Sequence, residues 1–205
     1  MGFEDQRLTL TQLDLLKEIG TIGSATAATA LAEMVACKVE IAVPQVSLVP
    51  LENLATILDT PEKLYFVLDM EIKGDVGGRI FLLLSPDDAK FLASALLGRP
   101  AEELDFKDDM FRSSLQEACN ILGGAYVSAL ADMTSFTILT SIPSLALDMV
   151  GAILDFIFIQ IAQVSDEALF IKTDLQVKGL SMEGLFLLFP TTESLQKIFD
   201  ILGVK

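Results

Sequence analysis

The chain has 205 residues, 52% of them hydrophobic, and a mean hydropathy of +0.54, so we expect one sizeable domain with a large buried core. Its formal net charge is −15. The chain therefore lacks the basic surface typical of nucleic-acid-binding proteins, and binding to anionic membranes is disfavoured. It contains no histidine, which excludes Ser-His triads, histidine metal sites and imidazole acid–base catalysis.

The first half of the chain predicts a long helix, four strands and a closing helix. A capping box of Thr9 and Gln12 begins the long helix, whose apolar spacing continues to Met34. Ser85 followed by Pro86 is typical of the start of a helix. In chain order we expect the helix from Thr9 to Met34, strands at Lys38–Val43 and Gln45–Val49, a short helix or turn within Pro50–Leu58, a hairpin of Leu64–Ile72 with Arg79–Leu84, and a helix closing at Leu97-Gly98.

The second half predicts a similar order after a polar connector that contains a proline. Both halves end in a helix that closes on Leu-Gly. In chain order we expect the connector Arg99–Phe106, a central helix over about Lys107–Met133, a strand at Ser135–Ser141, helical character over Ser144–Leu154, strands at Phe156–Gln163, Ala168–Val177 and Gly184–Phe189, and a helix over Thr192–Leu202.

The two halves are related by an internal repeat. A shift of 99 residues places Glu18 on Glu117 and Thr21 on Asn120, and in both copies a proline follows 23 residues later. Two halves of the order α–β–β–β–α would bury their apolar sheet faces together. The sequence therefore predicts a single α+β domain over 1–205, made of repeats at about 9–98 and 107–203, with pseudo-two-fold symmetry and an antiparallel-rich sheet. We expect the two long helices to carry the functional residues.

The candidate residues lie along one face of each long helix, because they are spaced four and three residues apart. The second site consists of Ser113, Glu117 and Asn120. The first site consists of Asp14, Glu18 and Thr21. A solvated helix face carries such residues equally well, and duplicated helices also keep their faces for packing. The recurrence of the acid at the same place in both copies favours a functional interpretation.

Other motifs indicate structure. The glycine-rich Lys73–Gly78 has no P-loop lysine with Ser or Thr and does not open a helix, so it predicts hairpin turn chemistry. Asp87-Asp88 fits the dipole of a helix N-terminus. Cys37 and Cys119 are expected to be free thiols, with Cys119 in the core because no cation is near it in the sequence.

The sequence also predicts a cytoplasmic protein without a transmembrane segment. The most apolar run, Met149–Ile161, contains Asp155 and Gln160 and is too short to span a bilayer. The residues Met1–Asp5 show neither the basic nor the apolar region of a secretory signal.

Taken together, the doubled helix motif with its spaced proline resembles the CheC/CheX/FliY family of phosphatases that act on the chemotaxis response regulator CheY. The segments Leu16–Gly20, Ala27–Ala30 and Gly124–Asp132 are the most CheC-like. The resemblance implies that Glu117 anchors to a receiver lysine and that Asn120 orients a water for attack on the aspartyl phosphate, with Ser113 and Asp14 accessory. It also implies no cofactor or metal of the chain's own, because the receiver carries the Mg²⁺.

The first site departs from the family pattern, since Thr21 stands where an Asn is expected. Its side chain is shorter and β-branched, so we expect Glu18 to help dock a receiver while the first site hydrolyses slowly or not at all. An alternative function is that of an adaptor for the receptor deamidase CheD and phosphorylated CheY, since Ser144–Val150 resembles the helix used for CheD. A FliY-like switch component is disfavoured because a further C-terminal motor domain is lacking.

Overall fold

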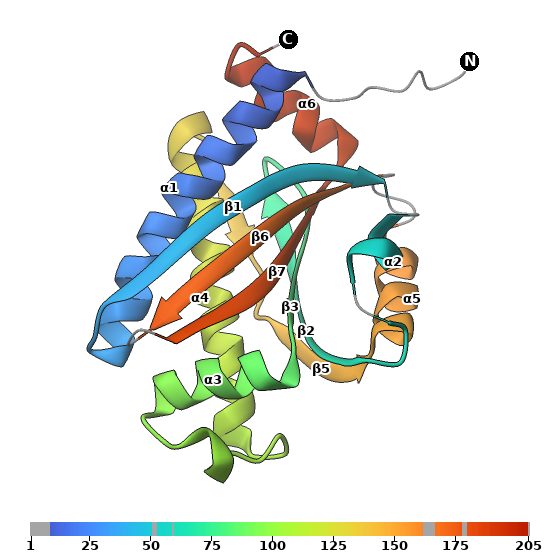
Figure 1. Cartoon of the computed structure of the whole chain (residues 1–205). Helices are drawn as coiled ribbons and strands as arrows, with labels where there is room; N and C mark the ends of the chain where they lie inside the picture. The colour runs from blue at the N-terminus through green and yellow to red at the C-terminus, as the bar shows by residue number, and fades with distance from the viewer. Residues whose placement is uncertain (1–8, 51–52, 59, 162–166, 178–179, 205) are drawn as a thin grey trace.

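The structure is a computed structural model that describes residues 9–50, 53–58, 60–161, 167–177 and 180–204. Two long helices lie side by side across one antiparallel sheet (Figure 1). In chain order the elements are α1 (Leu10–Val35), β1 (Val39–Pro50), α2 (Leu54–Ile57), β2 (Leu64–Gly74), β3 (Gly78–Leu84), α3 (Pro86–Leu97), the 3₁₀ turn η2 (Ala101–Glu103), α4 (Asp109–Thr134), β4 (Ile138–Thr140), β5 (Ser144–Met149), α5 (Val150–Ile161), β6 (Glu167–Val177), β7 (Leu180–Pro190) and α6 (Thr192–Ile201). This arrangement confirms the predicted α+β class with an antiparallel sheet.

The sheet mixes strands from both halves of the chain. Its order is β1-β6-β7-β3-β2-β4, with β5 also paired to β2, and each of these pairings is antiparallel. The strand order is similar when it is followed inward from either edge of the sheet. At one edge β1 pairs with β6 of the β6–β7 hairpin, and at the other edge β4 and β5 pair with β2 of the β2–β3 hairpin. Each half thus contributes strand pairing to the other half's hairpin: β1 to β6, and β4 and β5 to β2.

The sheet separates two apolar clusters because side chains alternate between its faces. On β2, Phe66, Leu68 and Met70 point to the face covered by α1, α3, α4 and α6, whereas Tyr65 and Val67 point to the face covered by α2 and α5. The first cluster is the larger one, and α4 supplies many of its members. One face of α4 is therefore fixed in the core while the opposite face is exposed.

Two strand predictions around Pro44 are wrong in detail. The structure has a single strand, β1, where the sequence predicted Lys38–Val43 and Gln45–Val49, and its pairing with β6 is interrupted between Ala42 and Gln45. Proline lacks an N–H group and is tolerated at irregular positions of edge strands. Because β1 lies at the edge of the sheet, Pro44 interrupts the ladder without ending the strand.

The region after Pro143 is also assigned wrongly from sequence. The predicted helix over Ser144–Leu154 is strand β5 up to Met149, paired with β2, and the predicted strand Phe156–Gln163 lies within α5 up to Ile161. Its last residues, 162 and 163, lie outside the described residues. The helix was missed because it is apolar on most sides. Its buried positions have helical spacing: Val150, Ile153, Leu154, Ile157 and Ile161.

The other predicted elements are present with small shifts at their ends. The capping box at Thr9 and Gln12, the Ser85 cap and the left-handed Gly98 at the end of α3 are all confirmed. Among the described helices none combines the length and the apolar character needed to cross a bilayer.

Candidate functional site

The second site is set by the way in which α4 is buried. Asp108 caps the helix by accepting a hydrogen bond from the N–H of Met110 at 2.9 Å, and the helix ends at Ser135 in the left-handed conformation. Ser113, Glu117 and Asn120 are all exposed. The structure therefore places the three predicted residues together on the solvent face of one rigid helix.

The side chains of Glu117 and Asn120 are exposed on α4. Within the part of the chain that the structure describes, neither forms a hydrogen bond or an ion pair. An exposed carboxylate and an exposed amide three residues apart present one acceptor group and one group that both donates and accepts. They are free to contact a partner molecule.

The segment after β4 is tied to α4 beside Asn120. Gln116 donates from Nε2 to the carbonyl of Pro143 at 2.7 Å, and Arg112 donates from Nη2 to the carbonyl of Leu145 at 3.2 Å. Arg112, Gln116 and Asn120 follow one another at intervals of four, so they form one row along the helix. Asn120 is the next position of this row, one turn beyond Gln116.

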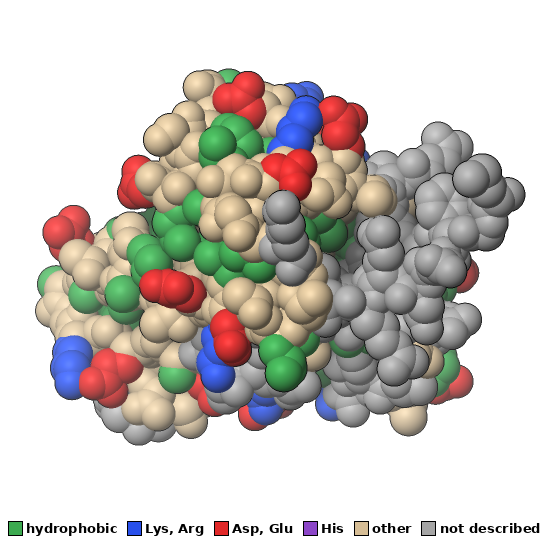
Figure 2. Space-filling model, turned by 90° about the horizontal axis from the view of Figure 1, so that it is seen from above, with side chains coloured by type: hydrophobic (Ala, Val, Ile, Leu, Met, Phe, Trp, Pro, Cys, Tyr) green, Lys and Arg blue, Asp and Glu red, His purple; other side chains and the backbone are tan. Residues whose placement is uncertain are grey.

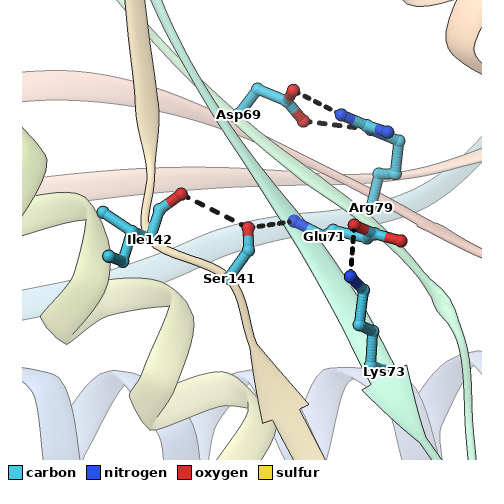
Figure 3. A network of polar contacts seen from close by, with 6 residues as sticks. All are labelled: Asp69, Glu71, Lys73, Arg79, Ser141 and Ile142. Atoms are coloured by element: carbon cyan, nitrogen blue, oxygen red, sulfur yellow. Dashed lines mark hydrogen bonds and ion pairs between the residues drawn. The ribbon is translucent and has the colours of Figure 1, made fainter.

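On its other side, the same segment is tied to the sheet, as Figure 3 shows. Ser141 accepts at Oγ from the N–H of Glu71 at 2.9 Å and donates its own N–H to the carbonyl of Glu71 at 2.9 Å. Further along the sheet, Arg79 on β3 forms a bidentate ion pair with Asp69 on β2. Its Nε donates to Oδ1 at 3.1 Å and its Nη2 donates to Oδ2 at 2.5 Å. The segment next to Asn120 is thus held from two sides.

The first site lies on α1, and its three side chains are also exposed. Asp14 and Glu18 have no hydrogen bond or ion pair within the described ranges. Thr21 differs, because its hydroxyl donates to the carbonyl of Lys17 in its own helix at 2.9 Å. This local bond directs the hydroxyl back along the helix.

The two sites do not come together. The helices α1 and α4 run in opposite directions (Figure 1) and touch where Gly23 meets Tyr126. A hydrogen bond of 3.0 Å between the hydroxyls of Ser24 and Tyr126 joins them there. Thr21 and Asn120 both precede this contact in their own helices, so the sites lie toward opposite ends of the helix pair.

Cys119, the neighbour of Asn120, is a buried thiol as the sequence predicted. Its Sγ lies 3.6 Å from Sδ of Met70. Burial, together with the nearby charge of Asp69, raises the pKa of the Cys119 thiol to about 12. Both cysteines are free, so Cys119 is a protonated core side chain beside the site.

An apolar cavity of about 50 Å³ lies under the first site. It is lined by residues of α1, α4, α6, β7 and the β2–β3 hairpin, among them Leu16, Tyr126 and Ile198. Figure 2 shows hydrophobic side chains in the middle of the face seen from above, with charged side chains around its margin. The cavity is far smaller than the roughly 300 Å³ of small-molecule sites, so it adds nothing to the site chemistry.

The anchoring residues Arg112 and Gln116 and the exposed Ile142 were not found from sequence. Their contacts join residues far apart in the chain, and the signal available was indirect. The recurrence of a proline at a fixed distance after each site marks the segment that Gln116 holds in the second half.

Comparisons with known proteins show a likeness to chemotaxis and flagellar switch proteins. The CheC-like family model matches residues 12–48 and 110–146. The CheY-P phosphatase CheC of Bacillus subtilis is 29% identical over 196 residues, which cover 94% of each chain. The flagellar motor switch phosphatase FliY of the same organism is 26% identical over 141 residues, covering 68% of this chain and 36% of FliY.

Solved structures share the fold. FliY of Thermotoga maritima has a TM-score of 0.77 and 21% identity, with 96% of this chain and 98% of that one covered. A structure of the CheX–CheY–BeF₃–Mg²⁺ complex from Borrelia burgdorferi has a TM-score of 0.50 and 20% identity, with 85% and 97% covered. The family model matches both site-bearing helices, and the likeness to CheC extends over nearly the whole length. The chain is therefore similar to the CheC-like proteins at both site-bearing helices and to CheC over most of its length.

Proposed function

We propose that this protein is a phosphatase that hydrolyses the aspartyl phosphate of a CheY-type response regulator. The observation that carries the proposal is the exposed pair of Glu117 and Asn120 on α4, which makes no hydrogen bond or ion pair among the residues that the structure describes. The likeness to a relative named CheY-P phosphatase CheC, over 94% of both chains, supports it.

Asn120 is the proposed catalytic residue. Hydrolysis of an acyl phosphate needs a water placed in line with the bond to the leaving carboxylate. An amide can accept a hydrogen bond from that water and donate another without adding charge beside the phosphate. The exposed position of Asn120 lets it enter a partner's phosphorylation site. Alignment of the water would supply the rate enhancement.

Glu117 is the proposed anchor. It lies one helical turn before Asn120 on the same exposed face, so an ion pair with a receiver lysine would fix the approach of the amide. Ser113, one turn further back, would extend the contact. The receiver would bring the Mg²⁺ that neutralises the phosphate, and the phosphatase would need no metal or cofactor of its own.

At the first site, we propose docking with little hydrolysis. Glu18 is exposed like Glu117, but the hydroxyl of Thr21 is directed to the carbonyl of Lys17. To orient a water, it would have to leave that bond, and it would still reach less far than an amide.

The test is the decay of a phosphorylated CheY-type receiver in the presence of the full chain. Wild type is expected to accelerate decay, and Asn120→Ala to lower the acceleration by roughly 10²-fold. Ser128→Ala, at another exposed position of α4, is the matched control and should keep the wild-type rate. Thr21→Asn is expected to add activity. An unchanged rate for Asn120→Ala would refute the assignment of the catalytic residue.

The adaptor function with CheD is a second proposal, favoured by one observation. The helix α5, which begins at the last residue of the segment Ser144–Val150, exposes Phe156 by 38% and Ile159 by 76%. These positions are three apart on one helix face and could receive an apolar partner surface. A pull-down with a CheD-type deamidase, repeated with Ile159→Ser, tests this. Retention of binding by that variant would argue against α5 as the contact.

A further inference from the structure

The residue Ile142 is an apolar side chain held out into solvent. It is 88% exposed, although the residues on both sides of it are fixed. Ser141 is bonded to the backbone of Glu71 in both directions, and the carbonyl of the buried Pro143 accepts from Gln116. Because the flanking backbone is already held, covering this isoleucine with a partner costs little backbone ordering, although its side-chain rotamers still lose freedom.

The two hydrogen bonds from α4 to this segment indicate that Ile142 lies near the level of Asn120. Arg112 donates to the carbonyl of Leu145, and Gln116, one turn later on α4, donates to the carbonyl of Pro143. The segment therefore runs in the opposite direction to α4. One further turn reaches Asn120 on the helix and the level of Ser141–Ile142 on the facing segment. Figure 3 shows Ile142 turned away from the Asp69–Arg79 pair.

A glycine borders the same surface. Gly124 lies one turn after Asn120, and a Cβ at this position would meet nothing within 4 Å. A glycine inside a helix costs about 1 kcal/mol relative to alanine. Packing within the chain does not account for it, so the absent side chain leaves open space beside Asn120.

The repeat carries the same pattern in sequence. In the second half a β-branched aliphatic residue precedes the proline, as Ile142-Pro143, and in the first half Val43-Pro44 has the matching place. The aliphatic residue before the proline thus recurs in both copies of the repeat.

We infer that Ile142 is an apolar anchor for the receiver domain, and that Gly124 gives that domain room to approach Asn120. The inference rests on the proposed function and names the surface through which the partner is recognised. A receiver seated over Asn120 must cover the neighbouring surface, because a domain is much larger than the side chain that enters it. Ile142 would be buried at that contact, which places it in an interface of the usual kind with an apolar centre.

The experiment measures kcat and KM for a phosphorylated CheY-type receiver, together with the affinity for the same receiver activated by beryllofluoride and Mg²⁺. Ile142→Ser is expected to raise KM and Kd about 5- to 20-fold, with kcat at saturation within about twofold of wild type. The control is Ile201→Ser, another exposed isoleucine, at the end of α6, which should leave both unchanged. Gly124→Ala should raise the melting temperature and also raise KM.

The outcomes separate the inference from the function on which it rests. If wild type does not accelerate decay, the proposed function itself fails. If wild type is active and Ile142→Ser keeps the wild-type KM and Kd, the anchor is refuted while the function stands. A variant that changes only the oligomeric state in size-exclusion chromatography would assign Ile142 to a contact between copies and overturn the inference as well.

Discussion

Three glycines on the two site-bearing helices make a sharp test of how these helices are packed. A Cβ at Gly23 would lie 2.9 Å from Cα and 3.1 Å from Cδ1 of Tyr126. At Gly123 it would lie 2.9 Å from Sδ of Met70, and at Gly124 nothing lies within 4 Å. The same substitution, glycine to alanine, therefore meets backbone, a flexible side chain and open space in turn.

The expected free energies of unfolding follow from these contacts. Each alanine gains about 1 kcal/mol of helix propensity. At Gly23 the helices must move apart, which costs about 1–3 kcal/mol of overpacking. The hydrogen bond between Ser24 and Tyr126, worth about 1 kcal/mol, would be lost with the shift. The net expectation is a loss of about 1–3 kcal/mol for Gly23→Ala, a change within about 1 kcal/mol of zero for Gly123→Ala, and a gain of about 0.5–1 kcal/mol for Gly124→Ala.

Urea unfolding followed by circular dichroism measures these differences, and an unchanged m-value keeps the three variants comparable. For a chain of this size each kcal/mol corresponds to about 2–4 °C in Tm. The order of stability should be Gly124→Ala above wild type and Gly23→Ala well below it. If Gly23→Ala were as stable as Gly124→Ala, the close contact between α1 and α4 would be wrong.

Three further predictions concern charge and the core. Arg79→Met should destabilise the protein by about 3–5 kcal/mol, because it leaves the carboxylate of Asp69, 8% exposed, without its partner; a loss below about 1 kcal/mol in urea unfolding would contradict this. The pKa of the Cys119 thiol is raised to about 12, so between pH 9 and 12 this thiol ionises only in the unfolded chain. Its contribution to the free energy of unfolding should therefore fall as the pH rises through that range. In the native protein at pH 8, an alkylating reagent should modify Cys37 and not Cys119. Because the net charge is −15 and receivers of the CheY type are often acidic, added salt should leave KM unchanged or lower it; a KM that rises with salt would point to an attractive steering field.

Local chemistry explains which elements were predictable. The capping box at Thr9 and the serine cap with proline at Ser85 are set by bonds within three or four residues, so sequence alone reveals them. The hairpin around Lys73–Gly78 is likewise set by its turn and by the apolar runs that flank it. These contacts do not depend on the rest of the fold.

The region of β5 and α5 could not be read in this way. Ser144–Met149 is a strand because it pairs with β2, some 80 residues earlier in the chain. The following helix has an apolar run with Phe156 and Phe158 that favours a strand by composition, whereas in the structure it packs as a helix against the sheet and α2. Tertiary contacts decided both elements.

The candidate site divides along the same line. The face shared by Glu117 and Asn120 follows from helical spacing, and their exposure agrees with it. The bond of Thr21 to Lys17, and the tie from Gln116 to Pro143, depend on side-chain conformations and long-range contacts that no spacing rule contains. The sequence thus predicts the exposed helix face of Glu117 and Asn120, but not the hydrogen bonds that fix the side chains and the segment around it.

The two sites also differ in the side chains that hold the segment beside them, in addition to the change from Asn to Thr. At the positions that match Arg112 and Gln116, 99 residues earlier, the first half has Leu13 and Lys17. Leucine has no hydrogen-bond donor, and lysine is a flexible point donor without the planar amide of glutamine. In the second half both donors tie the segment beside Asn120 to α4. The first half lacks this pair of donors. Thr21→Asn would therefore restore the reacting amide without the anchored segment beside it. The activity of the first site in this variant should remain below that of the second site.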